Sequence, residues 1–174
     1  EEMLVIVTGD HGETFWEHGD FGHGRQLYEE SVVVPLVLLG GLAGEARRSE
    51  IPVSLIDVHP TLMAAAGLEM DAIRDLRQIT ETRVVFSETE QDGVHLRAAW
   101  LDTRKLLWDW EQQSWQGFDL ANDPNESAPV YADLLLKRAL RARFDAVEPL
   151  PSDVVEDLNL DPVQDEALRS LGYR

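Results

Sequence analysis

One stretch near the start of the chain decides the fold: Met3-Leu4-Val5-Ile6-Val7-Thr8-Gly9-Asp10-His11 (residues 3–11). A short apolar run rich in β-branched residues and closed by Thr-Gly is typical of a buried strand in a parallel sheet. A buried strand needs neighbours on both sides, so we expect earlier strands to be missing or supplied by another chain. Asp10 and His11 follow this strand directly, and ligands of open α/β sheets bind past the carboxyl ends of the strands.

Strand and helix patterns alternate along the next hundred residues. The apolar run at 32–39 predicts a second strand, limited by Pro35. Asp57 is expected to cap a helix over about 58–66 that Gly67 ends. Later patterns predict further strands at 83–87, 96–101, 105–110 and 118–120, an amphipathic helix over 129–147 and a short last helix at 162–171. The predicted fold class is α/β with an antiparallel appendage.

Composition excludes several kinds of partner and site. The chain has 174 residues, 33 of them acidic and 15 basic, for a net charge of −18. With no basic stripe to displace counterions, we expect no nucleic-acid partner. No apolar run approaches the roughly 18 residues of a membrane span, so no transmembrane segment is expected in this chain. The absence of Cys excludes disulfides, thiolate zinc sites and a Cys nucleophile.

The window at residues 8–24 is where chemistry is expected. It contains three of the five His residues, four carboxylates and five Gly. The carboxylate of Asp10 and the imidazole of His11 suit a divalent cation of intermediate hardness, and His23 is free to face the same crevice. Two ligands do not complete a catalytic metal site, and a solvated loop explains the same residues. The residues alone support two explanations equally well: a metal- or anion-binding site and a solvated loop.

Two other features of this window are weighed. Glu13 and Glu17 would share a face if the segment were helical; a solvated face is favoured there over an acid–base pair. His18 has no assigned role, although contact with a substrate stays open.

A family resemblance rests on an ordered series of motifs. The series comprises Val5-Ile6-Val7-Thr8-Gly9-Asp10-His11-Gly12-Glu13, Gly22-His23-Gly24, Leu27-Tyr28-Glu29-Glu30, Val34-Pro35-Leu36, Asp57-Val58-His59-Pro60-Thr61-Leu62, Phe118-Asp119-Leu120, Asp123-Pro124-Asn125-Glu126 and Leu171-Gly172-Tyr173. Single pieces are weak, but the order is specific. It resembles the sulfatase family of the alkaline phosphatase superfamily over nearly the whole chain.

The resemblance implies a role for each matching residue. Asp10 would be a metal ligand, and His11 would be a second ligand or would contact the nucleophile. His23 takes the place of a Lys or His that binds the transferred sulfate or phosphate group, so His23 and His11 are the implied catalytic residues. The implied cofactor is a divalent cation, with Ca²⁺ first and Mn²⁺, Mg²⁺ or Zn²⁺ as alternatives.

The family's nucleophile and its paired Asp-Asp metal motif are absent from this sequence. A formylglycine or an unmodified Ser or Thr is therefore expected in a missing N-terminal part. The implied fold is the C-terminal part of an alkaline-phosphatase-like sandwich with a small antiparallel sheet and a helix. Residues 1–90 would be the C-terminal half of the α/β core, and 91–174 the small sheet and helix region of the same structural unit.

The expected function is that of the C-terminal portion of a metal-dependent hydrolase of sulfuric or phosphoric esters, inactive on its own. A phosphonate or phosphoester hydrolase or phosphotransferase of the same superfamily stays open, as does a degenerate, non-catalytic binding domain. The expected partner is a small-molecule sulfate or phosphate ester. Core surface left exposed in such a portion could also drive pairing with a second copy.

Overall fold

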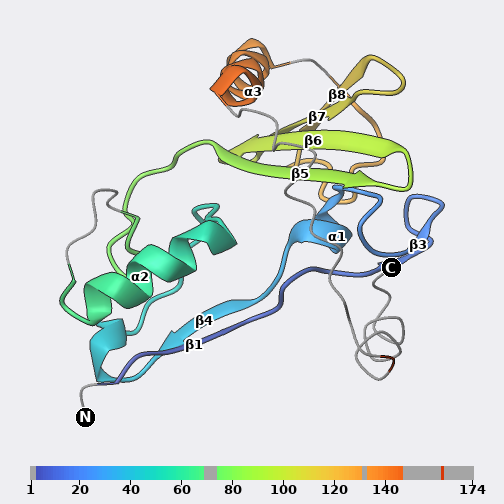
Figure 1. Cartoon of the computed structure of the whole chain (residues 1–174). Helices are drawn as coiled ribbons and strands as arrows, with labels where there is room; N and C mark the ends of the chain where they lie inside the picture. Colours follow the sequence, from blue (N-terminus) through green and yellow to red (C-terminus); the bar gives the residue numbers. More distant parts are fainter. Residues whose placement is uncertain (1–2, 69–73, 131–132, 147–161, 163–174) are drawn as a thin grey trace.

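The computed structural model describes residues 3–68, 74–130, 133–146 and 162. The strands are β1 (Val5–Thr8), β2 (Thr14–Phe15), β3 (Phe21–Gly22), β4 (Leu36–Leu39), β5 (Val85–Gln91), β6 (Val94–Leu101), β7 (Arg104–Asp109) and β8 (Ser114–Asp119). The α-helices are α1 (Glu29–Val32), α2 (Val58–Ala65) and α3 (Leu134–Ala146), and 3₁₀ turns lie at Gly41–Ala43 and Leu55–Asp57. The β1–β4 ladder and α2 lie on one side of Figure 1, and the β5–β8 sheet with α3 lies on the other.

The strand predicted at the start of the chain forms, but the predicted parallel pairing is wrong, and in this chain the strand is exposed. β1 pairs antiparallel with β4, with Val5 opposite Leu39 and Val7 opposite Val37. Because residues that face each other across a ladder share one face, these four side chains form an apolar surface. All four are exposed, from 37% for Val5 to 52% for Val7. Among the described residues this ladder has only two strands, so nothing there covers that face.

Proline and glycine set the ends of the early elements as expected. β4 begins at Leu36, directly after Pro35, because proline is tolerated before a strand and not inside its ladder. Val32 belongs to the end of α1 and not to the strand, so the predicted strand starts later than its apolar run. Gly67 takes a left-handed backbone with φ +75° just past α2, which ends the helix.

Asp57 precedes α2 as predicted but does not cap it. Its side chain makes no cap hydrogen bond to α2, and the capping side chain at this turn is Ser54, which accepts from the backbone N–H of Ile56. The Asp57 carboxylate is fully buried, pairs with the guanidinium of Arg83 and lies 3.9 Å from Arg74 Nη1. It therefore joins the start of α2 to the segment that follows residues 69–73.

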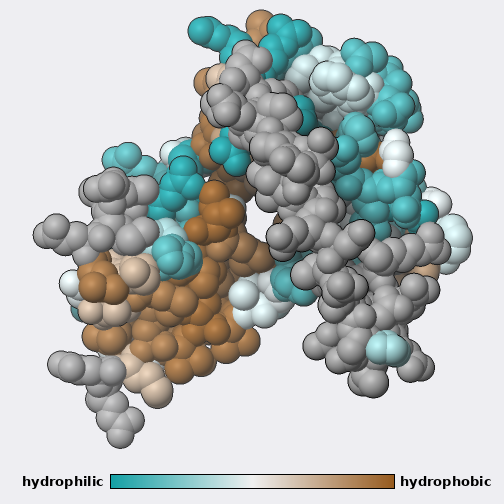
Figure 2. All heavy atoms as spheres, in the orientation of Figure 1, coloured by the Kyte–Doolittle hydropathy of each residue, from teal (hydrophilic) through white to brown (hydrophobic). Residues whose placement is uncertain are grey.

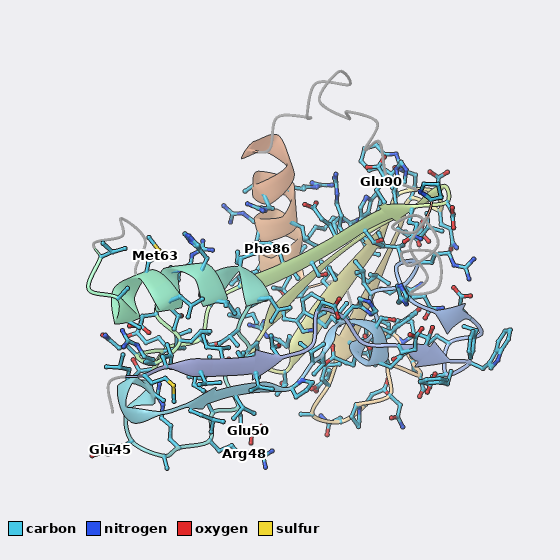
Figure 3. All side chains as sticks on the ribbon, turned by 60° about the horizontal axis from the view of Figure 1, so that its bottom comes forward. Glu45, Arg48, Glu50, Met63, Phe86 and Glu90 are labelled. Atoms are coloured by element: carbon cyan, nitrogen blue, oxygen red, sulfur yellow. The ribbon has the colours of Figure 1, made fainter. Side chains whose placement is uncertain are left out.

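The predicted C-terminal sheet is confirmed, with four antiparallel strands in the order β5-β6-β7-β8. Successive side chains of a strand point to opposite faces of a sheet, and both faces are buried at the centre of this one. On one face Ala99 and Leu106 pack against Leu136 and Leu140 of α3. Phe86 belongs to this side and lies near the foot of α3, whereas Glu90 marks the far end of β5 (Figure 3). The other face packs against the segment before α1.

A buried ionic cluster joins the early segment to this sheet. Lys105 is fully buried, and its Nζ lies 2.7 Å from Glu126 Oε1 and 3.2 Å from Glu29 Oε1. Trp100 Nε1 donates to the same Glu29 oxygen at 2.8 Å, and Lys105 Nζ lies 4.7 Å from the centre of the Trp100 ring. Glu126 Oε2 in turn accepts from the backbone N–H of Glu29 at 2.6 Å. The start of α1 is thereby fastened to β6, β7 and the loop after β8.

Two further predictions concern helices. The amphipathic helix is confirmed in part: α3 starts at Leu134, later than the predicted 129. The short helix expected at 162–171 lies outside the described residues, apart from Pro162. No helix in the described ranges combines the length and apolar character required to cross a membrane.

Candidate functional site

Asp10 and His11 emerge together from the end of β1. Asp10 Oδ1 accepts the backbone N–H of His11 at 3.0 Å, and Asp10 Oδ2 lies 3.8 Å from His11 Nε2. The hydrogen bond from the backbone N–H of His11 turns the Asp10 carboxylate toward the imidazole of His11. The Asp10 side chain is 77% exposed and that of His11 33% exposed. An oxygen of Asp10 and a nitrogen of His11 therefore approach each other on an accessible surface.

The hydrogen bond of His11 fixes which ring nitrogen can act as a ligand. Nδ1 lies 2.7 Å from the carbonyl oxygen of Gly12. Because a carbonyl only accepts, Nδ1 carries the hydrogen, and in the neutral ring the lone pair is on Nε2. Nε2 is the atom that faces Asp10. Metal-binding histidines usually donate their second ring N–H to a carbonyl or carboxylate in this way, so this pair fits two positions of a cation site.

His23 is brought to the same place by the β2–β3 hairpin. Its ring stacks on that of His11, with centroids 4.0 Å apart and planes inclined by 26°. The base of the hairpin is closed by Thr14, which is buried and donates its hydroxyl to the carbonyl of Gly22 at 2.6 Å. Three predicted site residues, separated by up to thirteen positions in the sequence, are thus in contact or nearly so.

The loop that carries these residues is fixed to α1. The backbone N–H groups of Gly12 and Glu13 donate to the carbonyls of Ser31 and Glu30, at 2.8 and 3.0 Å. A β-carbon on Gly12 would lie 2.0 Å from the carbonyl oxygen of Glu30, so only glycine allows this close approach. The loop is also held at its other end, where Thr89 of β5 donates to the carbonyl of Gly24.

Two carboxylates that the sequence analysis did not assign support the histidines. The stretch from Glu13 to Glu17 is not helical, so the shared helix face considered for these two residues does not exist. Glu13 Oε2 lies 3.4 Å from Nδ1 of His23. Glu30 Oε1 lies 2.6 Å from Nδ1 of His18, whose ring stacks on Tyr28 at 3.6 Å. The contacts of His18 therefore connect the β2–β3 hairpin with the start of α1.

A large hollow opens beside the site. It lies between β4 and β5, has a volume of about 1650 Å³ and reaches Asp10 and His11. Typical small-molecule pockets measure roughly 300–1,000 Å³, so this hollow has room for more than a small ligand. Much of its wall is apolar and comes from β4 and from the loop at 43–56.

The donors present in the described residues do not complete a metal site. In these ranges no three His, Asp or Glu side chains are grouped so as to hold an ion. Asp10 and His11 therefore supply two donors, and a catalytic metal usually takes three or more. The remaining ligands, and the nucleophile that the resemblance implies, would have to come from elsewhere.

Comparison with known proteins gives a consistent result. Residues 1–68 match the family model described as Sulfatase. The chain is 31% identical over 159 residues to the uncharacterized sulfatase YidJ of Escherichia coli K12, an alignment that covers 84% of this chain and 32% of YidJ. The chain belongs to the sulfatase family. It is also 27% identical over 153 residues to arylsulfatase K of Bos taurus, covering 76% of this chain and 28% of that protein.

Solved structures of this family share its fold. The structure titled BT1596, a 2-O GAG sulfatase, matches 97% of this chain and 36% of its own chain, with a TM-score of 0.61 and 18% identity. BT4656, solved in complex with its substrate D-glucosamine-2-N,6-O-disulfate, gives a TM-score of 0.57 at 17% identity and matches 97% of this chain and 34% of its own. The predicted sulfatase-like architecture is therefore confirmed. This sulfatase-family chain spans about a third of the length of the curated relatives it matches.

Proposed function

We propose that this chain is the C-terminal portion of a metal-dependent hydrolase of sulfuric esters and supplies part of its active site. The observation that carries the proposal is the meeting of Asp10, His11 and His23 beside an accessible hollow. Sulfatase-type hydrolysis is supported by the family membership. The particular ester, and the choice of sulfate over phosphate, belong to the proposal.

In this function Asp10 and His11 hold a divalent cation, for which Ca²⁺ is the first candidate and Mn²⁺, Mg²⁺ and Zn²⁺ are alternatives. Such an ion, when bound, would draw charge from a sulfate oxygen. His23 lies next to His11 and would meet the transferred group, where a cationic ring stabilises negative charge on the leaving oxygen. The nucleophile, a formylglycine or a Ser or Thr, would lie in an N-terminal part of the parent protein.

Exposed apolar surface supports the idea that this chain packs against further polypeptide. Figure 2 shows the apolar atoms gathered over the region of β1, β4 and α2. The exposed side chains there include Val5, Val7, Val37 and Leu39. A soluble protein rarely leaves such a contiguous surface uncovered unless it is an interface. We propose that an N-terminal part of the parent covers it and fills the hollow beside Asp10.

The division of the chain is also a proposal. We propose that residues 1–90 are the C-terminal half of the α/β core and that 91–174 add the small sheet and helix within one structural unit. The contacts of Lys105 and of Glu126 with Glu29 support a single unit, because they join the two parts through the buried side chains of Lys105 and Glu126.

The experiment compares the full-length parent with this 174-residue chain. The parent is expected to release 4-nitrophenol from 4-nitrophenyl sulfate, to lose activity in a chelator and to regain it with Ca²⁺. D10N, H11Q and H23Q should each lower kcat/KM at least about tenfold, since each removes a group that meets the charge of the transition state. H59Q, in an exposed residue of α2, is the matched control and should not.

Several results would contradict the proposal. Steady turnover by the 174-residue chain alone would show that no N-terminal nucleophile is needed. Preference for 4-nitrophenyl phosphate or a phosphonate ester would favour the phosphoester or phosphonate alternative. A parent that is inactive on all of these esters, yet binds sulfate, would favour the non-catalytic binding domain.

A further inference from the structure

Four arginines line a small pocket between the turn before α2, the strand β5 and the helix α3. The pocket has a volume of about 260 Å³. This is just below the roughly 300–1,000 Å³ of pockets that hold drug-sized ligands, so its occupant would be small. In Figure 1 the first residues of β5 lie between α2 and α3. The polar groups that could meet a ligand there belong to Arg74, Arg83, Arg97, Arg143, Ser54 and Ser87.

The arginines bring more positive charge to this pocket than their contacts balance. Asp57 pairs with Arg83, but its Oδ1 accepts no hydrogen bond from the described residues and lies 3.9 Å from Arg74 Nη1. Glu88 Oε2 lies 3.5 Å from Arg97 Nε. These contacts supply two carboxylates for four guanidinium groups, in a chain whose net charge is −18. Because like charges brought together repel, an anion between them would remove an unfavourable free energy.

The four arginine side chains are placed where an anion can reach them. Those of Arg74, Arg83 and Arg97 are between 31% and 44% exposed, and Arg143 is exposed on the last turn of α3. A guanidinium group presents its N–H donors in a rigid fork that fits the oxygens of sulfate or phosphate. Ser54 Oγ accepts a backbone N–H at 3.4 Å, which leaves the hydroxyl hydrogen for a further acceptor. The wall therefore offers hydrogen-bond donors and positive charge together.

The pocket and the loop that carries His23 lie against opposite ends of β5. The strand begins at Val85 in the pocket wall and ends at Gln91, whose Oε1 would lie 2.0 Å from a β-carbon on Gly24. At about 3.3 Å per residue, the strand spans roughly 20 Å between these ends. None of residues 8–24 lines the pocket. An anion bound there would therefore be held by a set of side chains that the candidate site does not use.

We propose that this arginine pocket binds a small oxyanion, sulfate or phosphate, either as the free ion or as the charged group of a small molecule. The inference goes beyond the proposed function and does not depend on ester hydrolysis. The arginines come from the segment between α2 and β5, from β6 and from α3. A bound anion would therefore link these elements, and it would stabilise the fold because it binds only the folded chain.

The first test is a titration of the 174-residue chain at constant ionic strength, because salt screens exposed charges. Sodium sulfate, sodium phosphate and sodium chloride are added separately, and ¹H–¹⁵N NMR spectra follow the arginine Nε–H groups. R74Q and R143Q identify two of the signals. Sulfate or phosphate is expected to shift both signals saturably and with the same Kd, whereas chloride should not.

The same titration distinguishes the two sources of the anion. Glucose 6-sulfate and glucose 6-phosphate carry the charged groups on a small molecule. If either ester binds more tightly than the free ion, the pocket is a site for a small molecule. If the free ion binds as tightly or more tightly, the pocket is a site for the ion itself.

The second test measures Kd by calorimetry in variants. R74Q/R143Q should raise the Kd of sulfate or phosphate at least about tenfold, because it removes charge-assisted hydrogen bonds. Arg83 is left in place because it pairs with the buried Asp57. R141Q is the matched control, since Arg141 is also exposed on α3 but does not line the pocket, and it should keep the wild-type Kd. H23Q should also keep it.

Several outcomes overturn the proposal. One is the absence of a saturable shift with either ion and either ester. Another is an equal response of Arg141 and Arg143, which would mean that the anion meets the whole surface. An unchanged Kd in R74Q/R143Q, in a chain that still unfolds cooperatively in urea, also overturns it. So does a Kd that is raised by H23Q and not by R74Q/R143Q. If the double variant does not fold, the single variants R74Q and R143Q decide in the same way.

Discussion

The Nζ atom of Lys105 and the Oε1 atom of Glu126 lie 2.7 Å apart in a pair that is almost wholly removed from solvent. Lysine is rarely buried unless it is paired with an opposite charge, so the burial of Lys105 depends on its carboxylate partners. Its second carboxylate, Glu29, belongs to the segment that leads from His23 into α1. The ion cluster therefore connects the C-terminal sheet with the hairpin that carries the candidate site.

Removal of the lysine charge should destabilise the protein strongly. We expect K105M to lower the free energy of unfolding by about 3–5 kcal/mol, because the buried Glu126 and the partly buried Glu29 lose their cation. Urea unfolding followed by tryptophan fluorescence measures the loss. K137M is a matched control: Lys137 is the only other lysine of the chain, it also lies over a tryptophan ring, and it is partly exposed. Equal losses in the two variants would contradict the role assigned to the cluster.

Stability should depend on pH through Glu126. Burial raises the pKa of Glu126 above its ordinary 4.5, and this outweighs the attraction of Lys105. A carboxyl group whose pKa is raised by folding contributes stability below its unfolded pKa and loses that contribution as pH rises through the folded value. The free energy of unfolding of E126Q should therefore increase relative to that of the wild type as pH rises from about 4.5, by at most ~1.4 kcal/mol per pH unit.

The pH comparison needs a carboxylate outside the cluster as its reference. E50Q provides one, because Glu50 lies in the loop after β4 with its side chain 81% exposed. The difference between E50Q and the wild type should be constant over the same range. A constant difference for E126Q as well would show that Glu126 titrates no differently in the folded and unfolded chains.

The buried pair of Asp75 and Arg77 should show the opposite dependence. Burial of Asp75 opposes its ionisation, but hydrogen bonds from Arg77, at 2.9 Å from Nε and 2.7 Å from Nη2, lower the pKa of Asp75 below its ordinary value of 3.8. We expect D75N to lower the free energy of unfolding by about 2–3 kcal/mol at pH 7. Because a lowered pKa gives stability that is lost as pH falls through the folded value, this loss should shrink below about pH 4.

Thermal or urea unfolding of D75N at pH 7 and pH 3 measures this effect. D102N is the control, since Asp102 lies in the β6–β7 turn with φ +54°, a conformation that asparagine also tolerates. A loss for D75N that is the same at both pH values would mean that the charge of Asp75 is not what stabilises the pair.

The apolar face of the β1–β4 ladder should make the isolated chain self-associate. Val7 and Val37 lie opposite each other on it, 52% and 44% exposed. We expect V7T/V37T to raise the concentration at which the chain associates, because two methyl groups are replaced by hydroxyls on the contact surface. Sedimentation velocity measures this, and V130T, in a valine that is 62% exposed away from the ladder, serves as control.

The two explanations of that face make different predictions. If an N-terminal part of the parent covers it, addition of that part should make the self-associated chain dissociate. Monomeric behaviour of the wild-type chain at high concentration would contradict any role of Val7 and Val37 as an interface.

The sequence by itself determined the elements with strong local signals. Local patterns predicted strands at 96–101 and 105–110, which are β6 and β7, and Pro35 and Gly67 marked the start of β4 and the end of α2. The order of short motifs also identified the sulfatase family, because a series of weak matches in one order is specific. The placement of Asp10 and His11 after β1 followed from the same local reading.

Only the tertiary structure decided which distant residues support one another. Local patterns could not show that β1 pairs antiparallel with β4, since the partner of a strand depends on long-range contacts. Nor could they show that Glu13 faces His23 across a hairpin, that Asp57 turns from its helix to Arg83, or that Lys105 is buried between two carboxylates. For Asp57 and Lys105, folding supplies the opposite charges that make the burial of a charged side chain stable, and these partners are distant in the sequence.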